Sequence, residues 1–272
     1  MINLNGTIIK KTEDILNSNN RAFKYGDALF ETIKVKDLKV YFIEDHYFRL
    51  MASMRMLRME IPMNFTLEFF ENELIKTVKQ VNLENARVRF TVYRKDGGLY
   101  NPLTNAVDYL IEALPLTSIV KENYEIDLFK DYYLYSGLLS TLKTTNKITN
   151  VLASIYASEN EVDNCILLNE KKQVVEAING NIFIIKDNLI KTPPITEGCV
   201  KGIARKKILE IIRNIENLEI QETVISPFEL QKANEVFITN VLIGVQPVSV
   251  YKKRNFKTEI SNTIALEFNK LV

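Results

Sequence analysis

The chain is poor in the residues that most catalytic and metal sites require. It contains one histidine, His46, and two cysteines, Cys165 and Cys199. A Ser-His-Asp triad or a Cys-His pair would have to use His46. A zinc site of the usual kind needs more ligands than these three separated residues provide, so no metal is expected. Two cysteines cannot form a disulfide framework, which indicates a reducing compartment; the apolar run around Cys165 predicts a buried strand.

Several other signals are missing. The formal net charge is only +1, which argues against nucleic acid or a membrane surface as a partner. The N-terminal residues MINLNGTIIKK lack the apolar core of a signal peptide, and no run approaches the ~20 apolar residues that span a bilayer. Neither a GxxxxGK(S/T) loop nor a GxGxxG turn is present. We therefore expect a cytoplasmic protein, and an enzyme of this composition must rely on lysine, carboxylate, tyrosine or a cofactor.

What is present is the composition of an ordinary globular protein, with 272 residues of which 46% are hydrophobic. This length suggests two domains or one large one. Asn5-Gly6 between two apolar runs is a strong hairpin signal. In the first half, residue spacing predicts hairpins at 2–9 and 31–42, helices at 44–59 and 66–80, and strands at 86–94 and 107–113.

The pattern changes after a polar run at 117–124, which is predicted to be a linker. Ser226-Pro-Phe-Glu229 is a capping box with proline at the first helical position. Predicted strands lie at 132–142, 164–168, 173–176, 181–186 and 189–191, and predicted helices at 149–160, 203–215, 227–232 and 258–270. The chain is thus predicted to be an α+β protein, with a smaller N-terminal domain (1–116) and a larger C-terminal domain (125–272), without the regular alternation of a doubly wound sheet.

Two ionisable residues stand at the ends of predicted strands. Lys143 follows the strand-like run YLYSGLLSTL. Partial burial there would disfavour the ammonium form and make the amine a usable nucleophile, whereas the alternative is a solvated surface lysine. Glu176 closes the run QVVE before a turn. It is either an acceptor aimed into a cleft or an ordinary exposed acid.

Two further segments have the form of ligand sites. Gly202 precedes a predicted helix, whose free N–H groups can bind an anion. Thr239 and Asn240 interrupt the apolar run from Val236 to Val248. Their side chains are either ligand donors or parts of a satisfied turn.

Five ordered motifs cover nearly the whole chain. They are RAFKYGDALFETI at 21–33, HYFRL at 46–50, LKTTN at 142–146, EAINGNIF at 176–183 and KGIAR at 201–205. In this order and spacing they resemble the fold-type IV pyridoxal phosphate (PLP) enzymes, also called class IV aminotransferases. That family contains branched-chain and D-amino acid aminotransferases and 4-amino-4-deoxychorismate lyases. The resemblance implies a two-domain fold-type IV architecture, a homodimer and a small amino substrate.

The resemblance also implies roles for individual residues. Lys143 would form the Schiff base with PLP and then remove the substrate Cα proton. Glu176 would face the pyridine nitrogen, and Arg49 would reach the phosphate. Backbone N–H groups of Ile203 and Ala204 would bind the same phosphate. The other cofactor-binding residues implied are Asn181, Gly202, Thr239 and Asn240.

Fewer residues of the sequence indicate where the substrate binds. Tyr25 matches an aromatic position that lines the substrate side in the family. Arg87, Arg89 and Arg94 alternate imperfectly on one predicted strand, and Arg89 or Arg94 is expected to hold a substrate carboxylate; a solvent-facing basic strand is the alternative. The loop at 94–105 is expected to determine specificity.

Three departures bear on the branch of the family. Ile148 stands where the branched-chain group commonly has tyrosine, and Leu99 and Asn101 replace the Arg-x-His trap of the D-amino acid group. The segment from Thr239 to Val248 resembles the lyase group. The resulting hypothesis is a lyase of the 4-amino-4-deoxychorismate type, which releases pyruvate and p-aminobenzoate for folate synthesis. The alternatives are a transaminase of branched-chain or other small amino acids with 2-oxoglutarate, and a non-catalytic PLP-binding protein.

Overall fold

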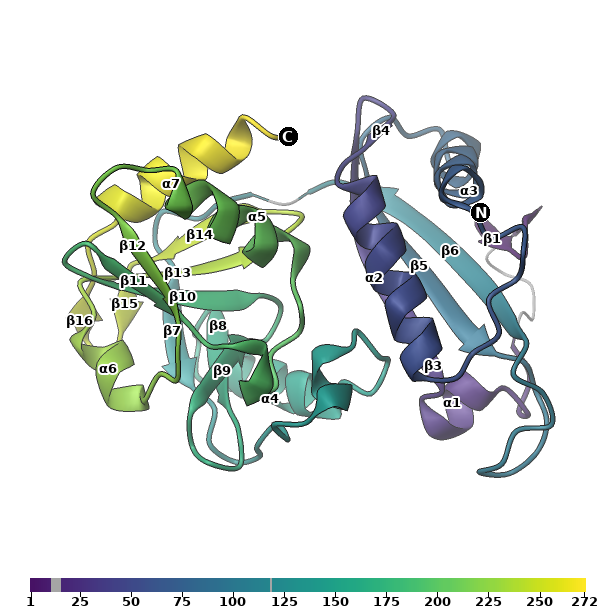
Figure 1. Ribbon diagram of the computed structural model, residues 1–272, viewed down its shortest axis with the longest axis horizontal. Helices are drawn as coiled ribbons and strands as arrows, with labels where there is room; N and C mark the ends of the chain where they lie inside the picture. Colours follow the sequence, from purple (N-terminus) through teal and green to yellow (C-terminus); the bar gives the residue numbers. More distant parts are fainter. Residues whose placement is uncertain (11–15, 118) are drawn as a thin grey trace. The chain divides into compact units, whose positions relative to one another are not determined.

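A computed structural model describes residues 1–10, 16–117 and 119–272. The chain divides into two compact units (Figure 1). Unit 1 comprises Met1–Thr117 and the short segment Lys143–Asn146, and unit 2 comprises Ser118–Leu142 and Lys147–Val272. Both units mix helices and strands, which confirms the α+β prediction.

Unit 1 is built on one six-stranded sheet in the order β2-β1-β6-β5-β3-β4. Asn5 and Gly6 both have positive φ, as a two-residue hairpin turn requires, and so do Asp37 and Leu38 in the second hairpin. Both predicted hairpins are confirmed. The strands are β1 (Ile2–Leu4), β2 (Thr7–Ile9), β3 (Ala28–Lys36), β4 (Lys39–Val40), β5 (Ala86–Arg94) and β6 (Val107–Pro115).

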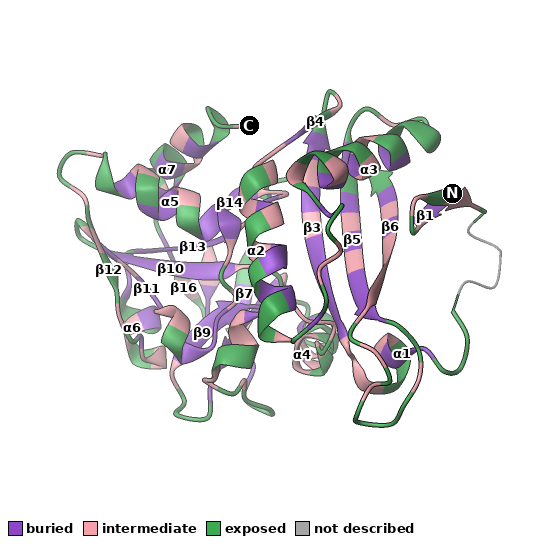
Figure 2. Ribbon diagram, turned by 45° about the vertical axis from the view of Figure 1, so that its right-hand side comes forward, coloured by how far each residue is buried: buried purple, intermediate pink, exposed green. Residues whose placement is uncertain are grey.

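Two helices, α2 (Ile43–Met56) and α3 (Leu67–Gln80), pack against this sheet and each other. From Ala86 to Val92, every second residue of β5 is buried (Figure 2), because successive side chains of a strand point to opposite faces. Among them, Phe90 lies 4.8 Å from Phe70 of α3, between ring centres. Both predicted helices are confirmed. A short helix not predicted from the sequence, α1 (Arg21–Tyr25), precedes β3.

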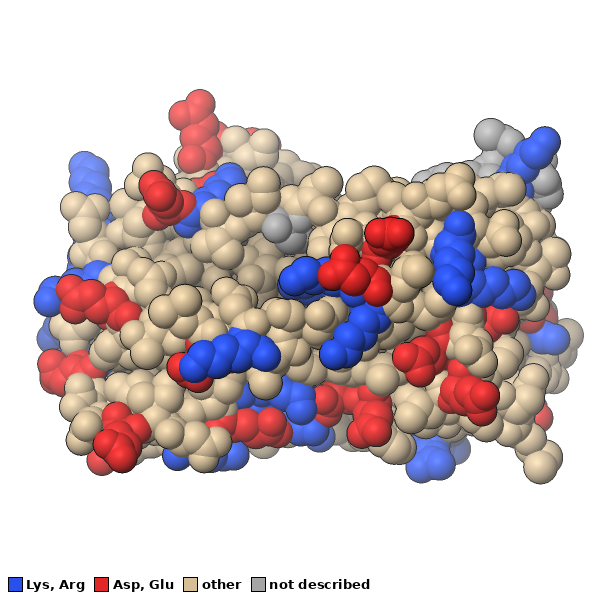
Figure 3. All heavy atoms as spheres, turned by 90° about the horizontal axis from the view of Figure 1, so that it is seen from above, with Lys and Arg blue, Asp and Glu red and all other residues tan. Residues whose placement is uncertain are grey.

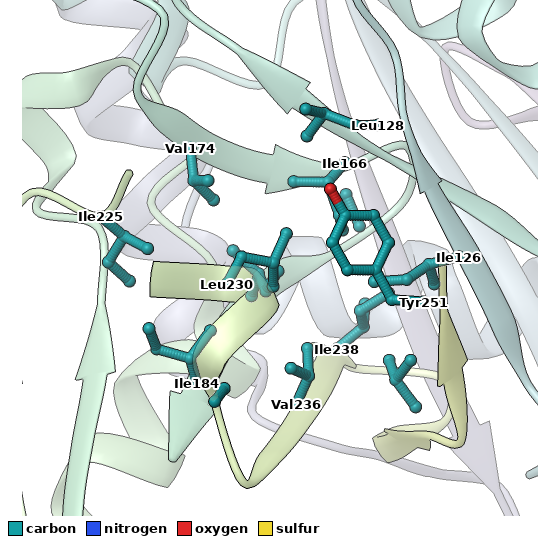
Figure 4. Packing of buried hydrophobic residues seen from close by; sticks show 14 of the residues in the cluster. Ile126, Leu128, Ile166, Val174, Ile184, Ile225, Leu230, Val236, Ile238 and Tyr251 are labelled. Carbon is teal, nitrogen blue, oxygen red and sulfur yellow. The ribbon is translucent and has the colours of Figure 1, made fainter. Parts of the chain in front are cut away.

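Unit 2 contains two five-stranded sheets, ordered β12-β11-β10-β13-β14 and β16-β15-β7-β8-β9. One buried apolar cluster draws its residues from both sheets, for example Ile166 and Val236 (Figure 4). Leu230 of α6 (Pro227–Lys232) joins the same cluster. The strands are β7 (Glu125–Leu128), β8 (Asn164–Leu168), β9 (Val174–Ala177), β10 (Asn181–Lys186), β11 (Leu189–Thr192), β12 (Glu219–Glu222), β13 (Glu235–Asn240), β14 (Gly244–Val248), β15 (Val250–Tyr251) and β16 (Arg254–Asn255).

Helices cover the outer faces of unit 2. On β8, Ile166 and Leu168 face the shared cluster, whereas Cys165 and Leu167 pack against α4 (Ile148–Glu159). Burial on both faces explains the unbroken apolar run, and the prediction for Cys165 is confirmed. Helices α5 (Ile203–Arg213) and α7 (Glu259–Asn269) pack on the other sheet. The predicted capping box at Ser226 and Glu229 is also confirmed.

The predicted strand at 132–142 is wrong. The structure has a single bridge there, from Leu134 to Asn169, followed by a 3-10 turn at Leu138–Thr141 (η1). Tyr135, Leu138 and Leu139 are exposed, so this apolar run is not buried in a sheet. The first strand of unit 2 is β7, which ends before the run begins.

Surface charge is mixed. On the face drawn in Figure 3, basic and acidic side chains lie among each other and no large area carries one sign. Within the described parts of the chain, no helix is long and apolar enough to cross a membrane.

Candidate active site

Lys143 lies in an extended segment beside the start of β3. The Phe30 N–H donates to the Lys143 carbonyl oxygen at 2.9 Å, and the Thr145 N–H donates to the Ala28 carbonyl oxygen at 3.1 Å. Leu29 and Thr144 form an antiparallel bridge between these bonds. The lysine is therefore held by backbone pairing with β3, although no strand leads into it as the sequence predicted.

The aromatic ring of Phe30 lies beside two cationic side chains. Lys143 Nζ is 4.4 Å from the ring centre, and Arg89 Cζ is 3.8 Å from it. The two cationic groups thus lie beside the same ring. Arg89 Nε also donates to Thr91 Oγ1 at 3.3 Å.

On the opposite face of the same sheet, Glu31 joins Arg49 and His46 of α2. Glu31 is 1% exposed and accepts from Arg49 Nε at 2.8 Å, from Arg49 Nη2 and from His46 Nδ1 at 2.7 Å. Burial acts to raise the pKa of the Glu31 carboxyl, but the charge of Arg49 and the bond from His46 outweigh it and lower that pKa to about 2. Glu31 is therefore ionised and fixes the plane of the Arg49 guanidinium.

His46 is fully buried, and burial lowers its pKa despite the opposing effect of Glu31. The imidazole is therefore neutral. Its proton belongs on Nδ1, because an ionised carboxylate can only accept. Nε2 of His46 has no hydrogen-bond partner among the described residues.

Arg89 and Arg94 have different environments because their odd spacing places them on opposite faces of β5. Arg94 is 6% exposed and donates to Asp27, to the Asn105 side chain and to the Leu57 carbonyl oxygen. Its guanidinium holds the end of β5 to the residue after α2. The structure thus separates the two arginines predicted for substrate binding, and only Arg89 lies beside the ring that Lys143 approaches.

Tyr25 is the last residue of α1. The Cζ atom of Arg21 lies 5.0 Å from the centre of its ring, and the ring of Tyr100 lies 5.6 Å from it, between centres. Tyr25 is therefore in contact with the loop at 95–106, which overlaps the stretch 94–105 that is expected to determine specificity.

In unit 2, the side chains of Glu176 and Asn181 both form hydrogen bonds with the backbone of Val200. Glu176 Oε2 accepts from the Val200 N–H at 2.8 Å, and Asn181 Nδ2 donates to the Val200 carbonyl oxygen at 2.9 Å. Glu176 is 5% exposed, so it is not an ordinary strand-end acid. The next residue, Lys201, donates through its N–H to the Thr141 carbonyl oxygen at 3.2 Å. Thr141 lies two residues before Lys143 in the sequence.

Gly202 occupies the N-cap position of α5, where no side chain caps the helix. A Cβ atom on Gly202 would lie 2.0 Å from Asn181 Oδ1, so any other residue here requires Asn181 or the helix start to shift. The N–H groups of Ile203 and Ala204 belong to the first turn and have no intrahelical acceptor. Together with the helix dipole, they form an end of α5 suited to an anion such as a phosphate.

Thr239 and Asn240 end β13, and Thr239 pairs directly with Asn181. The Thr239 hydroxyl donates to the Gly244 carbonyl oxygen at 2.7 Å. Asn240 Oδ1 accepts from the N–H groups of Leu242 and Ile243, each at 3.0 Å. These side chains shape the turn at 241–243. The sequence left open whether they are ligand donors or parts of a turn whose polar groups are all hydrogen-bonded, and these contacts are those of the turn.

Sequence reasoning did not single out Glu31, His46 and Asp27 as site residues, although all three lie in the quoted motifs. An acid inside the apolar run ALFETIKV was the available signal, because a buried carboxylate needs a partner. Its partners could not be named without the packing of α2 on β3.

The comparisons with known proteins agree with this architecture. The family model for amino-transferase class IV matches residues 28–251. A putative branched-chain-amino-acid aminotransferase of Methanocaldococcus jannaschii is 30% identical over 91% of this chain and 86% of its own length. An aminodeoxychorismate lyase of Vibrio harveyi is 27% identical over 85% of each chain.

Among solved structures, a branched-chain aminotransferase of the thermophilic archaeon Thermoproteus uzoniensis with norvaline matches with a TM-score of 0.91 at 22% identity, covering 99% of this chain and 93% of that one. The fold is thus that of the fold-type IV enzymes, as predicted. The chain belongs to the class IV aminotransferases, which are PLP-dependent enzymes.

Proposed function

We propose that Lys143 carries the PLP of this enzyme and removes the substrate Cα proton. The observation that carries the proposal is the position of Lys143 and Arg89 beside the one ring of Phe30. A lysine amine and a guanidinium beside the same ring suit an amino substrate that also carries a carboxylate. PLP, when bound, withdraws electrons from the substrate Cα.

The donor set fits this cofactor group by group. The Lys143 amine matches the aldehyde, and the buried Glu176 carboxylate matches a protonated pyridine nitrogen. The N–H groups of Ile203 and Ala204 at the start of α5 match a phosphate, as does the Arg49 guanidinium. Asn181, Gly202, Thr239 and Asn240 are proposed to shape the cofactor-binding loops, since they hold Val200 and the turn at 241–243.

For the reaction itself, we favour a lyase of the 4-amino-4-deoxychorismate type. Ile148, which replaces the tyrosine common in the branched-chain group, is 69% exposed at the start of α4. The lyase-like segment from Thr239 to Val248 forms β13, the turn and β14. A lyase of Vibrio harveyi is among the relatives.

The second candidate is transamination of a branched-chain or other small amino acid. It is favoured by the relative from Methanocaldococcus jannaschii, which is named a branched-chain-amino-acid aminotransferase. Removal of the Cα proton by Lys143 is common to both reactions, so the same residues serve either one.

We also propose a homodimer. The helix α4 exposes Ile148, Val151 and Ile155 by 69%, 50% and 49%, at the spacing of one helical face. Leu138 and Leu139 of the preceding turn are each 65% exposed. An apolar surface of this kind is typical of a protein interface. A second copy is the proposed occupant, and light scattering of the purified protein should give twice the mass of one chain.

Two experiments test the function. The first is the visible absorbance of the purified protein before and after borohydride, with mass spectrometry of the peptide that contains Lys143. A band that bleaches and a pyridoxyl adduct on Lys143 are expected, and a protein that stays colourless with added PLP would refute the proposal. The second supplies aminodeoxychorismate and, separately, leucine with 2-oxoglutarate. Pyruvate release supports the lyase, whereas glutamate formation without pyruvate release favours the transaminase.

A further inference from the structure

Asp27 lies between two buried arginines. Its Oδ2 atom accepts from Arg21 Nε at 2.9 Å and from Arg94 Nε at 3.0 Å. Arg21 is 3% exposed and Arg94 is 6% exposed. Two guanidinium groups this deeply buried require a shared anion, because an uncompensated buried charge is strongly unfavourable.

The remaining donors of these arginines reach the loop at 95–106. Arg21 Nη1 donates to the carbonyl oxygens of Gly97 at 3.0 Å and Leu99 at 2.6 Å. Arg94 Nη1 donates to Asn105 Oδ1 at 2.5 Å. Both ends of the loop are thereby tied to one carboxylate, that of Asp27.

Burial does not hold this loop in place. Leu99, Tyr100 and Leu103 are 76%, 90% and 81% exposed, so they gain little from the hydrophobic effect. Gly98 has φ +76°, and a Cβ there would lie 2.2 Å from the Asn101 carbonyl oxygen, which marks a tight local turn. The polar anchors from Arg21 and Arg94 therefore help to determine where the turn lies on unit 1, together with the Glu60 N–H, which donates to the Asn105 carbonyl oxygen at 2.8 Å.

The backbone on either side of Asp27 holds the lysine segment. The Gly26 carbonyl oxygen accepts from Thr145 Oγ1 at 3.2 Å and from Asn146 Nδ2 at 3.0 Å. The Ala28 carbonyl oxygen accepts from the Thr145 N–H. Asp27 is thus the residue at which the loop at 95–106 and the segment that carries Lys143 are joined.

We propose that Asp27 is a positioning residue for substrate binding, acting through Arg21 and Arg94 on the loop at 95–106 and on Tyr25. Arg21 reaches both, because its guanidinium also lies over the Tyr25 ring. The proposal rests on the proposed function, since it takes Tyr25 and the loop to face the amino substrate. Without the negative charge of the carboxylate, the two guanidinium groups lose their shared counterion and repel each other, so the loop loses its fixed position.

The test is Asp27→Asn in the full-length protein loaded with PLP. With whichever substrate gives turnover, aminodeoxychorismate or leucine with 2-oxoglutarate, KM should rise roughly tenfold or more while kcat changes less than about threefold. The visible absorbance of bound PLP and the yield of the pyridoxyl adduct on Lys143 should be the same as in the wild type. Hydrogen exchange at 97–103 should accelerate. The matched control is Asp37→Asn, which changes an exposed acid in the turn between β3 and β4 of the same sheet and should move none of these values.

A second variant covers the case in which Asp27→Asn does not fold. Arg21→Lys keeps a cation beside Asp27 but cannot span two loop carbonyls, so it should accelerate exchange and raise KM in the same way. Unchanged exchange and unchanged KM in a folded variant would overturn the proposal, and so would a loss of kcat with KM unaltered. A wild-type protein without a Lys143 adduct would refute the proposed function instead, whereas the exchange measurement would still test the anchoring of the loop.

Discussion

Glu31 and Arg49 form a buried pair in which two guanidinium nitrogens donate to both carboxylate oxygens. The pair connects β3 to α2, and His46 completes it from the same helix. A guanidinium held in this way cannot rotate freely, so its position relative to β3 is fixed before any phosphate arrives. That preorganisation leads to the first two predictions.

Replacement of Glu31 by glutamine should destabilise the protein and weaken PLP binding. The Arg49 charge would stay buried without its counterion, which costs on the order of 3–5 kcal/mol. Calorimetry should show a clear drop in Tm, and titration with PLP should show weaker loading. Glu44→Gln, an exposed acid on the same helix, is the control and should change neither. Equal behaviour of the two variants would mean that the pair with Arg49 does not organise the site.

The same carboxylate should give the protein an acid-sensitive component of stability. The pKa of Glu31 is lowered from 4.5 to about 2. A carboxyl whose folded pKa is depressed contributes stability above its unfolded pKa and loses it as the pH falls through the folded value. Unfolding free energy should therefore fall between about pH 4.5 and pH 2, by on the order of 3 kcal/mol from this group. Urea titrations across that range should show a smaller decline in Glu31→Gln, and an identical decline would contradict the assignment.

Arg89 should contribute to substrate binding and not to cofactor binding. Loss of a charge-assisted hydrogen bond to a carboxylate costs roughly 1.5–3 kcal/mol, so Arg89→Gln should lower kcat/KM by about 10- to 100-fold. The absorbance of bound PLP should stay as in the wild type. Arg87→Gln is a close control, since Arg87 lies two residues away on the same face of β5 and is exposed. If Arg87→Gln has the larger effect, the substrate carboxylate is held elsewhere.

The limits of sequence reasoning are visible at particular residues. The bounds of β5 and β8 agree with the predicted ones because their apolar pattern reports burial directly. The run at 132–142 failed because tyrosine and leucine there are exposed, and composition alone cannot tell an apolar surface from an apolar core. Family motifs predicted Lys143, Glu176 and Gly202 as site residues. The pairing of Glu31 with Arg49 and of Asp27 with Arg21 and Arg94 depends on tertiary packing that no local pattern encodes.

Gly202 offers the most direct test of the phosphate end of the site. A methyl group at this position would lie 2.0 Å from Asn181 Oδ1, so Gly202→Ala must displace either Asn181 or the first turn of α5. Asn181 also holds the Val200 carbonyl oxygen, and hence its displacement should loosen the loop that precedes the helix. PLP affinity should fall at least about tenfold, as measured by fluorescence titration of the apoenzyme. The double variant Gly202→Ala with Asn181→Ala removes the clash, so its loss of affinity should be smaller than the sum of the two single losses. Strict additivity of the two effects would show that the methyl group acts without touching Asn181.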